Sequence, residues 1–324
     1  MIPDRPLLVS LLILVDSIPL ALSPPQGRGR PKHYPDRLFL KALVIMIVRH
    51  LPKVHTLMTV LEQPELDYLR ALLTENGRYP SRRTFERRLQ SIPDRLPAQI
   101  GCLGRHLVVL LHPWQDCGRA VAIDSTPLRA LGGVWHQKDR KADKLPHTSI
   151  DTEAHWTKSG WHGWVYGWKL HLVTTIAPVW IPLAAELTAA NIADNKQAPT
   201  LLEELPVDVR FVLGDTHYQD PELQACCATR DRVLIATKRG RYPHYDDGVA
   251  VRRVFHELRF RAIENLNGQF KGIFDCLGQV PTRGLMPTRR YILAAVLVYQ
   301  LALLHRFESG GDLRVGLKAL LKAA

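Results

Sequence analysis

Apolar residues recur every three or four positions through the first third of the chain, the period of a helix with one buried face. After Pro35, which suits a first helical turn, they fall at positions 38, 42, 45 and 46. Similar stretches follow at residues 54–62, 65–73 and 81–93. The pattern predicts an all-α region over residues 26–115, which begins with a linker rich in Pro and Gly.

A separate apolar stretch at residues 7–15 precedes that linker. Asp4 stands before it, Asp16 interrupts it, and no run of about 18 uncharged apolar residues follows. We interpret residues 1–25 as a packed N-terminal helix, and a secretion signal is the alternative.

From residue 119 the pattern changes to short runs rich in Val, Ile and Leu, which predict β-strands. These runs are residues 120–124, 166–175, 181–188, 210–215 and 232–237. Helical stretches at 194–205 and 221–230 separate the last three runs, and a long helix is expected over 252–279. This order predicts an α/β domain at residues 116–280, with a mixed sheet flanked by helices.

The last segment, residues 281–324, contains a strongly apolar helical stretch at 289–307. Its uncharged part covers about 14 residues, too few to cross a bilayer comfortably. We therefore predict a helix of the core or of a dimer interface, and no membrane partner.

The charge balance points to a polyanionic partner. Across 324 residues, 43 Lys and Arg face 31 Asp and Glu, a net charge of +12. Residues 28–105 hold 15 basic and 7 acidic side chains (15 − 7 = +8), so two thirds of the excess lies there. A basic N-terminal DNA-binding region followed by a better balanced body is the simplest interpretation.

Two groups of arginines are the candidates for DNA contact in that region. In the helix at 81–93, Phe85, Leu89 and Ile92 form an apolar stripe, which leaves four arginines exposed. These are Arg82, Arg83, Arg87 and Arg88, a predicted phosphate-binding face like that of a helix-turn-helix unit. In the linker, Arg28 and Arg30 lie in "RGRP", which is similar to a minor-groove AT-hook arm. A solvated basic helix and a solvated linker are the respective alternatives.

Two carboxylates end predicted strands. Asp124 follows "VAI" and Asp215 follows "FVLG", and an unpaired carboxylate in an apolar strand is costly to bury. Because strands of one sheet often deliver functional groups at their carboxyl ends, both acids could face one crevice. Taken singly, each could equally be a cap of a turn or helix.

A third acid lies in the long predicted helix. If residues 252–279 are helical, Arg261, Glu264, Gly268 and Lys271 share one stripe beside the apolar face. A surface ion-pair ladder would look similar, but Gly268 costs a helix about 1 kcal/mol relative to Ala. That cost is easier to understand if something bulky approaches closely there. Two Asp and one Glu on separate elements could hold two divalent cations for phosphoryl transfer.

These residues resemble a known family. Asp124 in "AIDST", Asp215 in "LGDTHYQD" and Glu264 in "RAIENLNGQFK" are similar to the catalytic triad of bacterial insertion-sequence DDE transposases. The resemblance runs from about residue 34 to residue 307 and includes "GWKLHL" and "LTAANIADN". The family places a lysine seven residues after its glutamate, as Lys271 does (271 − 264 = 7). Many relatives have an arginine four residues before the glutamate, where this chain has Phe260.

The resemblance implies a ribonuclease-H-like catalytic domain in which Asp124, Asp215 and Glu264 bind two Mg²⁺ ions, with Mn²⁺ as a possible substitute. Arg261 and Lys271 would neutralise the phosphodiester. It further implies binding to terminal inverted repeats and target DNA, cleavage and strand transfer, a homodimer in the active complex, and action in the bacterial cytoplasm at the nucleoid. The alternatives are a nuclease or junction resolvase of the same fold, and a catalytically silent DNA-binding descendant.

The stretch at 155–171 is unusually rich in histidine and tryptophan. His155, His162 and His171 are spaced by seven and nine residues without cysteine partners, which matches no structural zinc pattern. Strand packing is our interpretation of the tryptophans, with stacking on unpaired bases near a cleaved end as a hypothesis. His217 and Asp194 are interpreted as turn and helix-start residues.

Overall fold

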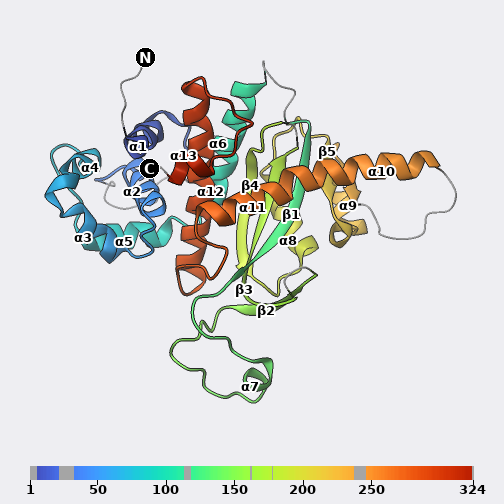
Figure 1. Ribbon diagram of the computed structural model, residues 1–324, viewed down its shortest axis with the longest axis horizontal. Helices are drawn as coiled ribbons and strands as arrows, with labels where there is room; N and C mark the ends of the chain where they lie inside the picture. Colours follow the sequence, from blue (N-terminus) through green and yellow to red (C-terminus); the bar gives the residue numbers. More distant parts are fainter. Residues whose placement is uncertain are drawn as a thin grey trace.

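The computed structural model describes residues 6–21, 33–112, 118–160, 163–176, 178–236 and 246–322. Within these residues one mixed sheet of six strands is packed between helices (Figure 1). The strands are β1 (Ala120–Arg129), β2 (His155–Ser159), β3 (Gly163–Thr175), β4 (Pro182–Ala189), β5 (Phe211–Gly214) and β6 (Val233–Ala236). The predicted α/β class is therefore confirmed.

The strand order is that of a ribonuclease-H-like sheet. It runs β2-β3-β1-β5-β6, and β4 also pairs with β3. β3 pairs antiparallel with β1 and with β4, whereas β5 lies parallel to β1 and β6 parallel to β5. Helix α8 (Asp194–Glu203) connects β4 to β5, and α9 (Pro221–Ala228) connects β5 to β6 as a parallel crossover.

The strand predictions were correct in place but not in every boundary. All five predicted strands are present. The first was predicted to end at Asp124, but β1 continues to Arg129, because residues 125–129 keep pairing with β3. β2 was missed, since its five residues carry no apolar run. Asp124 is therefore inside a strand and not at its end.

The N-terminal region is all-α, as predicted. Its elements are α1 (Leu7–Ser17), α2 (Asp36–Val48), α3 (Val54–Leu61), η1 (Pro64–Leu66), α4 (Asp67–Leu72), α5 (Arg82–Ser91) and α6 (Leu96–Leu111). Ser81 caps α5 by accepting the backbone N–H of Thr84. Helix α6 was not predicted. It packs against β4 and joins the helical region to the sheet.

The helix expected over 252–279 has different bounds and an irregular centre. α10 (Asp246–Arg259) runs into η3 (Phe260–Glu264), a single π-helical stretch, and then into α11 (Asn265–Ile273). Leu277, inside the predicted helix, lies beyond the end of α11 and is 73% exposed. α10 and α11 form one long rod across the sheet in Figure 1. The π stretch changes which side chains face the sheet.

The C-terminal apolar helix is a core element. α12 (Leu285–Glu308) is long and apolar enough to cross a membrane, but 78% of its apolar window is buried inside the protein. It packs against α1, α2, α6 and β4, and the short helix α13 (Lys318–Lys322) packs on α11. The hydrophobic core is continuous from α1 through the sheet to α12, so it crosses the predicted segment boundaries, which remain predictions.

Candidate active site

The register of the parallel pair β1 and β5 brings Asp124 and Asp215 side by side. Ala122 pairs with Leu213, and each acid stands two residues further along its own chain. Asp215 directly follows β5 but keeps an extended backbone, with φ −83° and ψ −172°. The acids therefore occupy equivalent positions on neighbouring extended segments, where side chains point to the same face.

The turn after Asp215 is built around that acid. Its carboxylate accepts the backbone N–H of His217 at 2.8 Å, and His217 Nδ1 lies 2.9 Å from Oδ2. The hydrogen bond to Asp215, followed by its charge, raises the pKa of His217 above its ordinary value. Gly214 is needed just before the acid, because a Cβ there would stand 2.8 Å from the Cβ of buried Tyr218. His217 is thus a turn residue, as interpreted, and also a direct partner of Asp215.

The π stretch brings Arg259, a residue that sequence reasoning missed, to Asp124. Arg259 donates from a guanidinium nitrogen to Asp124 Oδ2 at 3.1 Å, and the two side chains are only 10% and 13% exposed. Arg259 and Glu264 are five residues apart, a separation that would put them on different sides of an α-helix. A π turn, with its i to i+5 hydrogen bonds, returns the chain to one side after five residues.

The electrostatics of Asp124 show that the three predicted acids share one environment. The pKa of Asp124 is raised to about 7 in total: burial is the largest cause, the charges of Glu264 and Asp215 act in the same direction, and the Arg259 charge opposes them. Arg259 therefore does not compensate for burial and for two neighbouring carboxylates together. A site with this surplus of acidic charge favours an additional cation.

These carboxylates are suitable ligands for a divalent metal, but their side chains are not arranged around one position. Carboxylate oxygens are the ligands that Mg²⁺ and Mn²⁺ prefer. However, the described residues contain no group of three His, Cys, Asp or Glu side chains placed so that it could hold a metal ion. Glu264 is exposed, and one oxygen of Asp124 is engaged by Arg259. A metal held by these acids would require the Arg259 and Glu264 side chains to move.

The basic residues beside Glu264 behave differently from the predicted stripe. Lys271 is partly buried, and burial lowers its pKa, while the nearby Glu264 charge acts in the opposite direction. Arg261 is exposed. A Cβ on Gly268 would meet nothing within 4 Å, so no part of the described chain approaches this glycine. The structure places Lys271 within electrostatic reach of Glu264.

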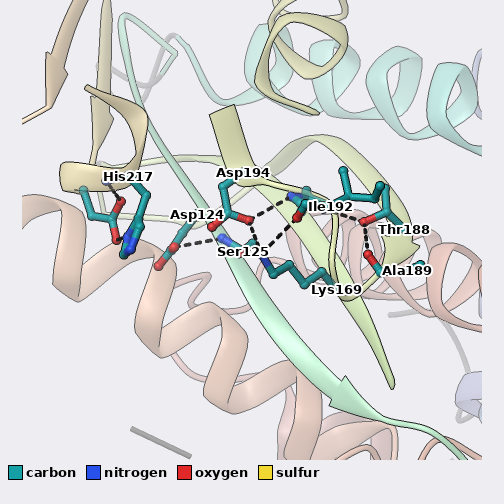
Figure 2. A network of polar contacts seen from close by, with 10 residues as sticks. Asp124, Ser125, Lys169, Thr188, Ala189, Ile192, Asp194 and His217 are labelled. Atoms are coloured by element: carbon teal, nitrogen blue, oxygen red, sulfur yellow. Dashed lines mark hydrogen bonds and ion pairs between the residues drawn. The ribbon is translucent and has the colours of Figure 1, made fainter. Parts of the chain in front are cut away.

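Helix α8 supports the second acid from the opposite face of the sheet. In Figure 2, Lys169 on β3 donates to Asp194 and to the carbonyl of Ile192, each at 3.0 Å. The next residue of α8, Asn195, donates to Asp220 at 2.6 Å. Because Asp220 caps α9 directly after the Asp215 turn, the first turn of α8 ties that turn to β3. Asp194 does start a helix, as interpreted.

A buried histidine, His171, lies next to the ion pair between Lys169 and Asp194. His171 is fully buried and shares a hydrogen bond with Thr188 at 2.9 Å. Burial lowers its pKa to about 4, so the ring is neutral near pH 7. Residues of the "GWKLHL" and "LTAANIADN" segments are therefore in contact with each other. The sequence analysis did not predict this contact.

Of the four arginines predicted to be exposed on α5, three are exposed and Arg88 is largely buried. Arg88 is turned inward, where it pairs with Asp36 and lies 4.6 Å from the centre of the Phe39 ring. Arg83 and Arg87 are exposed, and Arg82, also exposed, pairs with Glu86 at 2.8 Å. The prediction for Arg88 is wrong in its exposure, because α5 packs on α2 through that side. Two further candidates, Arg28 and Arg30, lie outside the described residues.

The fold and the acid-bearing strands define a protein of the ribonuclease-H-like class. The family model described as "Transposase DDE domain" matches residues 115–301, more than half of the chain. The chain belongs to this family and is a DDE transposase. Membership also implies dependence on a divalent metal.

Solved structures similar to this chain are also transposases, at low similarity. The piggyBac transposase synaptic complex with hairpin DNA is 9% identical with a TM-score of 0.38, covering 98% of this chain and 79% of that one. A pre-cleavage Mos1 transpososome is 12% identical (TM-score 0.22; 90% and 82% covered). The Mos1 mariner paired-end complex with Mn is 14% identical (TM-score 0.23; 92% and 85%). No curated protein matches the chain.

Proposed function

We propose that this transposase binds the terminal inverted repeats of its insertion sequence, cleaves the DNA there and joins the ends to target DNA. The observation that carries the proposal is the buried carboxyl of Asp124. Its pKa is raised to about 7 even though Arg259 contacts it, because burial and two further acids oppose its ionisation. Such a site is poised to accept cations as its ligands ionise.

Asp124, Asp215 and Glu264 would hold the metal, with Mg²⁺ proposed as the physiological ion, two per site, and Mn²⁺ as a substitute. When bound, these cations would activate the attacking oxygen and stabilise the leaving 3′ oxygen. The chain's own part is to release the ligands: Arg259 leaves Asp124 Oδ2, and His217 leaves Asp215 Oδ2. The Arg259 guanidinium and the His217 ring then become free to donate to phosphate oxygens.

The remaining predicted residues would position the DNA. Lys271 would neutralise the phosphodiester next to Glu264, and exposed Arg261 would contact the same strand further out. Arg82, Arg83 and Arg87 on α5, with Arg28 and Arg30 ahead of it, would bind phosphates of the repeat. Since joining requires two ends, we propose a homodimer in the active complex, acting in the bacterial cytoplasm at the nucleoid.

The test uses a duplex that carries the inverted repeats flanking this reading frame. Wild-type protein should nick it only when Mg²⁺ or Mn²⁺ is added. Asp124→Asn, Asp215→Asn and Glu264→Gln should each lower cleavage by about a thousandfold or more, because each removes a metal ligand. Binding to the uncut repeat should stay within about threefold, since the substitutions remove only like charge from the DNA surface.

Glu222→Gln on α9 is the matched control, because Glu222 is an exposed carboxylate of the same sheet domain and should leave cleavage unchanged. Pre-cut ends distinguish a transposase from a nuclease or resolvase of the same fold, since only the transposase joins them to a second duplex. Absence of metal-dependent nicking in the wild type would leave a catalytically silent DNA-binding protein as the answer.

A further inference from the structure

A long excursion between β1 and β2 projects from the sheet and has no part in the acid site. We name residues 130–154 the β1–β2 arm. Figure 1 shows it extending beyond the lower end of the sheet, with the short helix α7 (Gln137–Lys141) near its tip. Its sequence combines one tryptophan, Trp135, with three lysines, and the family assignment alone gives it no role.

The base of the arm is fixed to the first turn of α12. Asp151 accepts the backbone N–H of Gly284 at 2.7 Å, and Glu153 accepts that of Leu285 at 2.9 Å. Arg283 donates to the carbonyls of Thr148 and Ser149 at 2.6 and 2.9 Å. These charge-assisted bonds hold the arm at a defined angle to the sheet, so its tip is presented from a rigid support.

The tip is docked on the hairpin formed by β2 and β3. Trp156 on β2 donates its indole N–H to the carbonyl of Trp135 at 2.7 Å, and the ring of His136 stacks on Trp156 at 6.4 Å. Arg140 lies 5.1 Å from the centre of the Trp135 ring and contacts both ring nitrogens of His155 at 3.2 and 3.1 Å. The start of α7 and the hairpin therefore form one continuous surface.

An exposed tryptophan lies on that surface. In the antiparallel register Lys158 pairs with Trp164 and Trp156 pairs with Tyr166, so all four side chains share one face of the hairpin. Trp164 is 58% exposed and is the only described tryptophan among the exposed large hydrophobic residues. Trp156 supports it edge-on at 6.5 Å. An indole ring is thus held in a fixed orientation with one side open to solvent.

Exposed lysines lie on the same two elements. Lys158 is the cross-strand neighbour of Trp164, and Lys138 and Lys141 belong to α7, which begins next to His136. Lysine is depleted at protein–protein interfaces, where the centre of the patch is uncharged. Aromatic planes interleaved with fixed cations are typical of surfaces that bind single-stranded nucleic acid, by stacking on bases and neutralising phosphates.

We propose that the Trp164 face of the hairpin, together with α7, binds an unpaired strand of DNA. Leu172 on β3 lies opposite Asp124, and Trp164 is eight residues away along the strand, roughly 26 Å at 3.3 Å per residue. The surface therefore receives a strand several nucleotides from the reacting phosphate. This inference rests on the proposed function only in naming the strand as one released at a cleaved transposon end.

The experiment measures binding without metal, so that it does not depend on catalysis. Full-length protein is titrated, in EDTA, into a labelled duplex of the transposon end that is either blunt or carries a single-stranded extension of about ten nucleotides. The wild type should bind the extended duplex about tenfold more tightly, the effect expected of about one stacked base. Trp164→Leu should lose this preference, whereas Trp164→Phe should keep most of it.

The lysines give a second, independent measurement. Lys138→Glu combined with Lys158→Glu should reduce the preference for the extended duplex, while Lys196→Glu, an exposed lysine on α8, serves as the matched control and should not. Thermal unfolding of each variant checks that the fold is retained. Leucine is used at position 164 because it keeps an apolar side chain and removes only the aromatic face.

The inference is overturned if the wild type binds both duplexes equally, or if Trp164→Leu keeps the preference. It is likewise overturned if Trp164→Leu weakens blunt and extended duplexes by the same factor, because the contact would then be to paired DNA. If the preference is present but Mg²⁺-dependent cleavage is not, the proposed function fails and the strand-binding surface remains.

Discussion

Two arginine–aspartate pairs, one in each half of the molecule, differ in what surrounds them. In the helical region Asp36 pairs with both Arg88 and Arg95, and Arg88 also stacks on Phe39. In the sheet region Arg259 is the partner of Asp124 among the described ion pairs, and Glu264 and Asp215 add their negative charge. Asp36 thus has two arginine partners, whereas Asp124 has one arginine partner and two carboxylates that raise its pKa.

This difference separates a structural joint from a candidate metal site. A buried ion pair is stable only when its charges and hydrogen bonds are satisfied. Asp36 meets that condition within the protein, where it joins α2 to α5 and to Arg95 before α6. Asp124 does not, since its pKa stays raised to about 7. Removing one arginine from each pair, and adding metal, should therefore have unequal effects.

The largest expected effect is that of Arg259→Met in metal-free protein at alkaline pH. The folded-state pKa of Asp124, about 7, already exceeds its ordinary value of 3.8, so the folded protein retains a proton that the unfolded chain has lost. Stability therefore falls as pH rises through this window. Without Arg259 the pKa rises further and the window extends upward.

At pH 8.5 the Arg259→Met variant should be less stable than the wild type by about 3 kcal/mol, and at pH 5.5 by much less, because the carboxyl is then protonated. The slope between these values cannot exceed about 1.4 kcal/mol per pH unit for one group. Urea unfolding in EDTA at several pH values measures it. A pH-independent loss would mean that Arg259 acts only through packing.

The next largest effect is stabilisation by metal. Mg²⁺ or Mn²⁺ at about one hundred times its dissociation constant should stabilise the wild type by about 2.7 kcal/mol, since only the folded chain brings the acids together. Glu264→Gln should lose most of this gain. Asp36→Asn should keep all of it, although its baseline stability is lower. Unfolding temperatures with metal and with EDTA provide the comparison, and an equal gain in all three proteins would place the metal elsewhere.

A smaller loss is expected for Arg88→Met. Arg95 still neutralises Asp36, and the methionine side chain still covers Phe39, so the cost should be about 1 to 2 kcal/mol. It should show neither the pH slope of Arg259→Met nor any change in the metal response. Denaturant unfolding under the same conditions tests both points. A pH slope as steep as that of Arg259→Met would remove the contrast between the two pairs.

The smallest effect on stability is predicted one residue earlier, at exposed Arg87. Arg87→Gln should change the unfolding free energy by no more than about 0.5 kcal/mol. If this side chain contacts a phosphate, the slope of log affinity against log salt concentration should fall by about one. Arg88→Met should leave that slope unchanged, because Arg88 faces Asp36 and not solvent. DNA titrations at several salt concentrations separate the two neighbours.

The hydrophobic pattern predicted most of the fold, because burying one face of a helix or strand fixes the spacing of its apolar residues and the length over which they recur. The runs that became β3, β4, β5 and β6 were placed within a few residues of their observed bounds. β2 was missed because its alternating side chains make no apolar run. The end of β1 was misplaced because Asp124 looks like the end of an apolar run, although the strand continues through five more residues paired with β3.

For the site, the apolar pattern selected the candidate acids, which remain a prediction: Asp124 and Asp215 each follow an apolar run, and Glu264 lies in a segment with helical spacing. It could not determine the cation, because any assignment from sequence assumes 3.6 residues per turn. That period selects Arg261. The π stretch at Phe260–Glu264 instead puts Arg259 against Asp124. A π turn contains one more residue than an α-helical turn and is less favourable by itself. Contacts of this turn with β1 and β3 offset that cost, so only the tertiary structure decides that the turn forms.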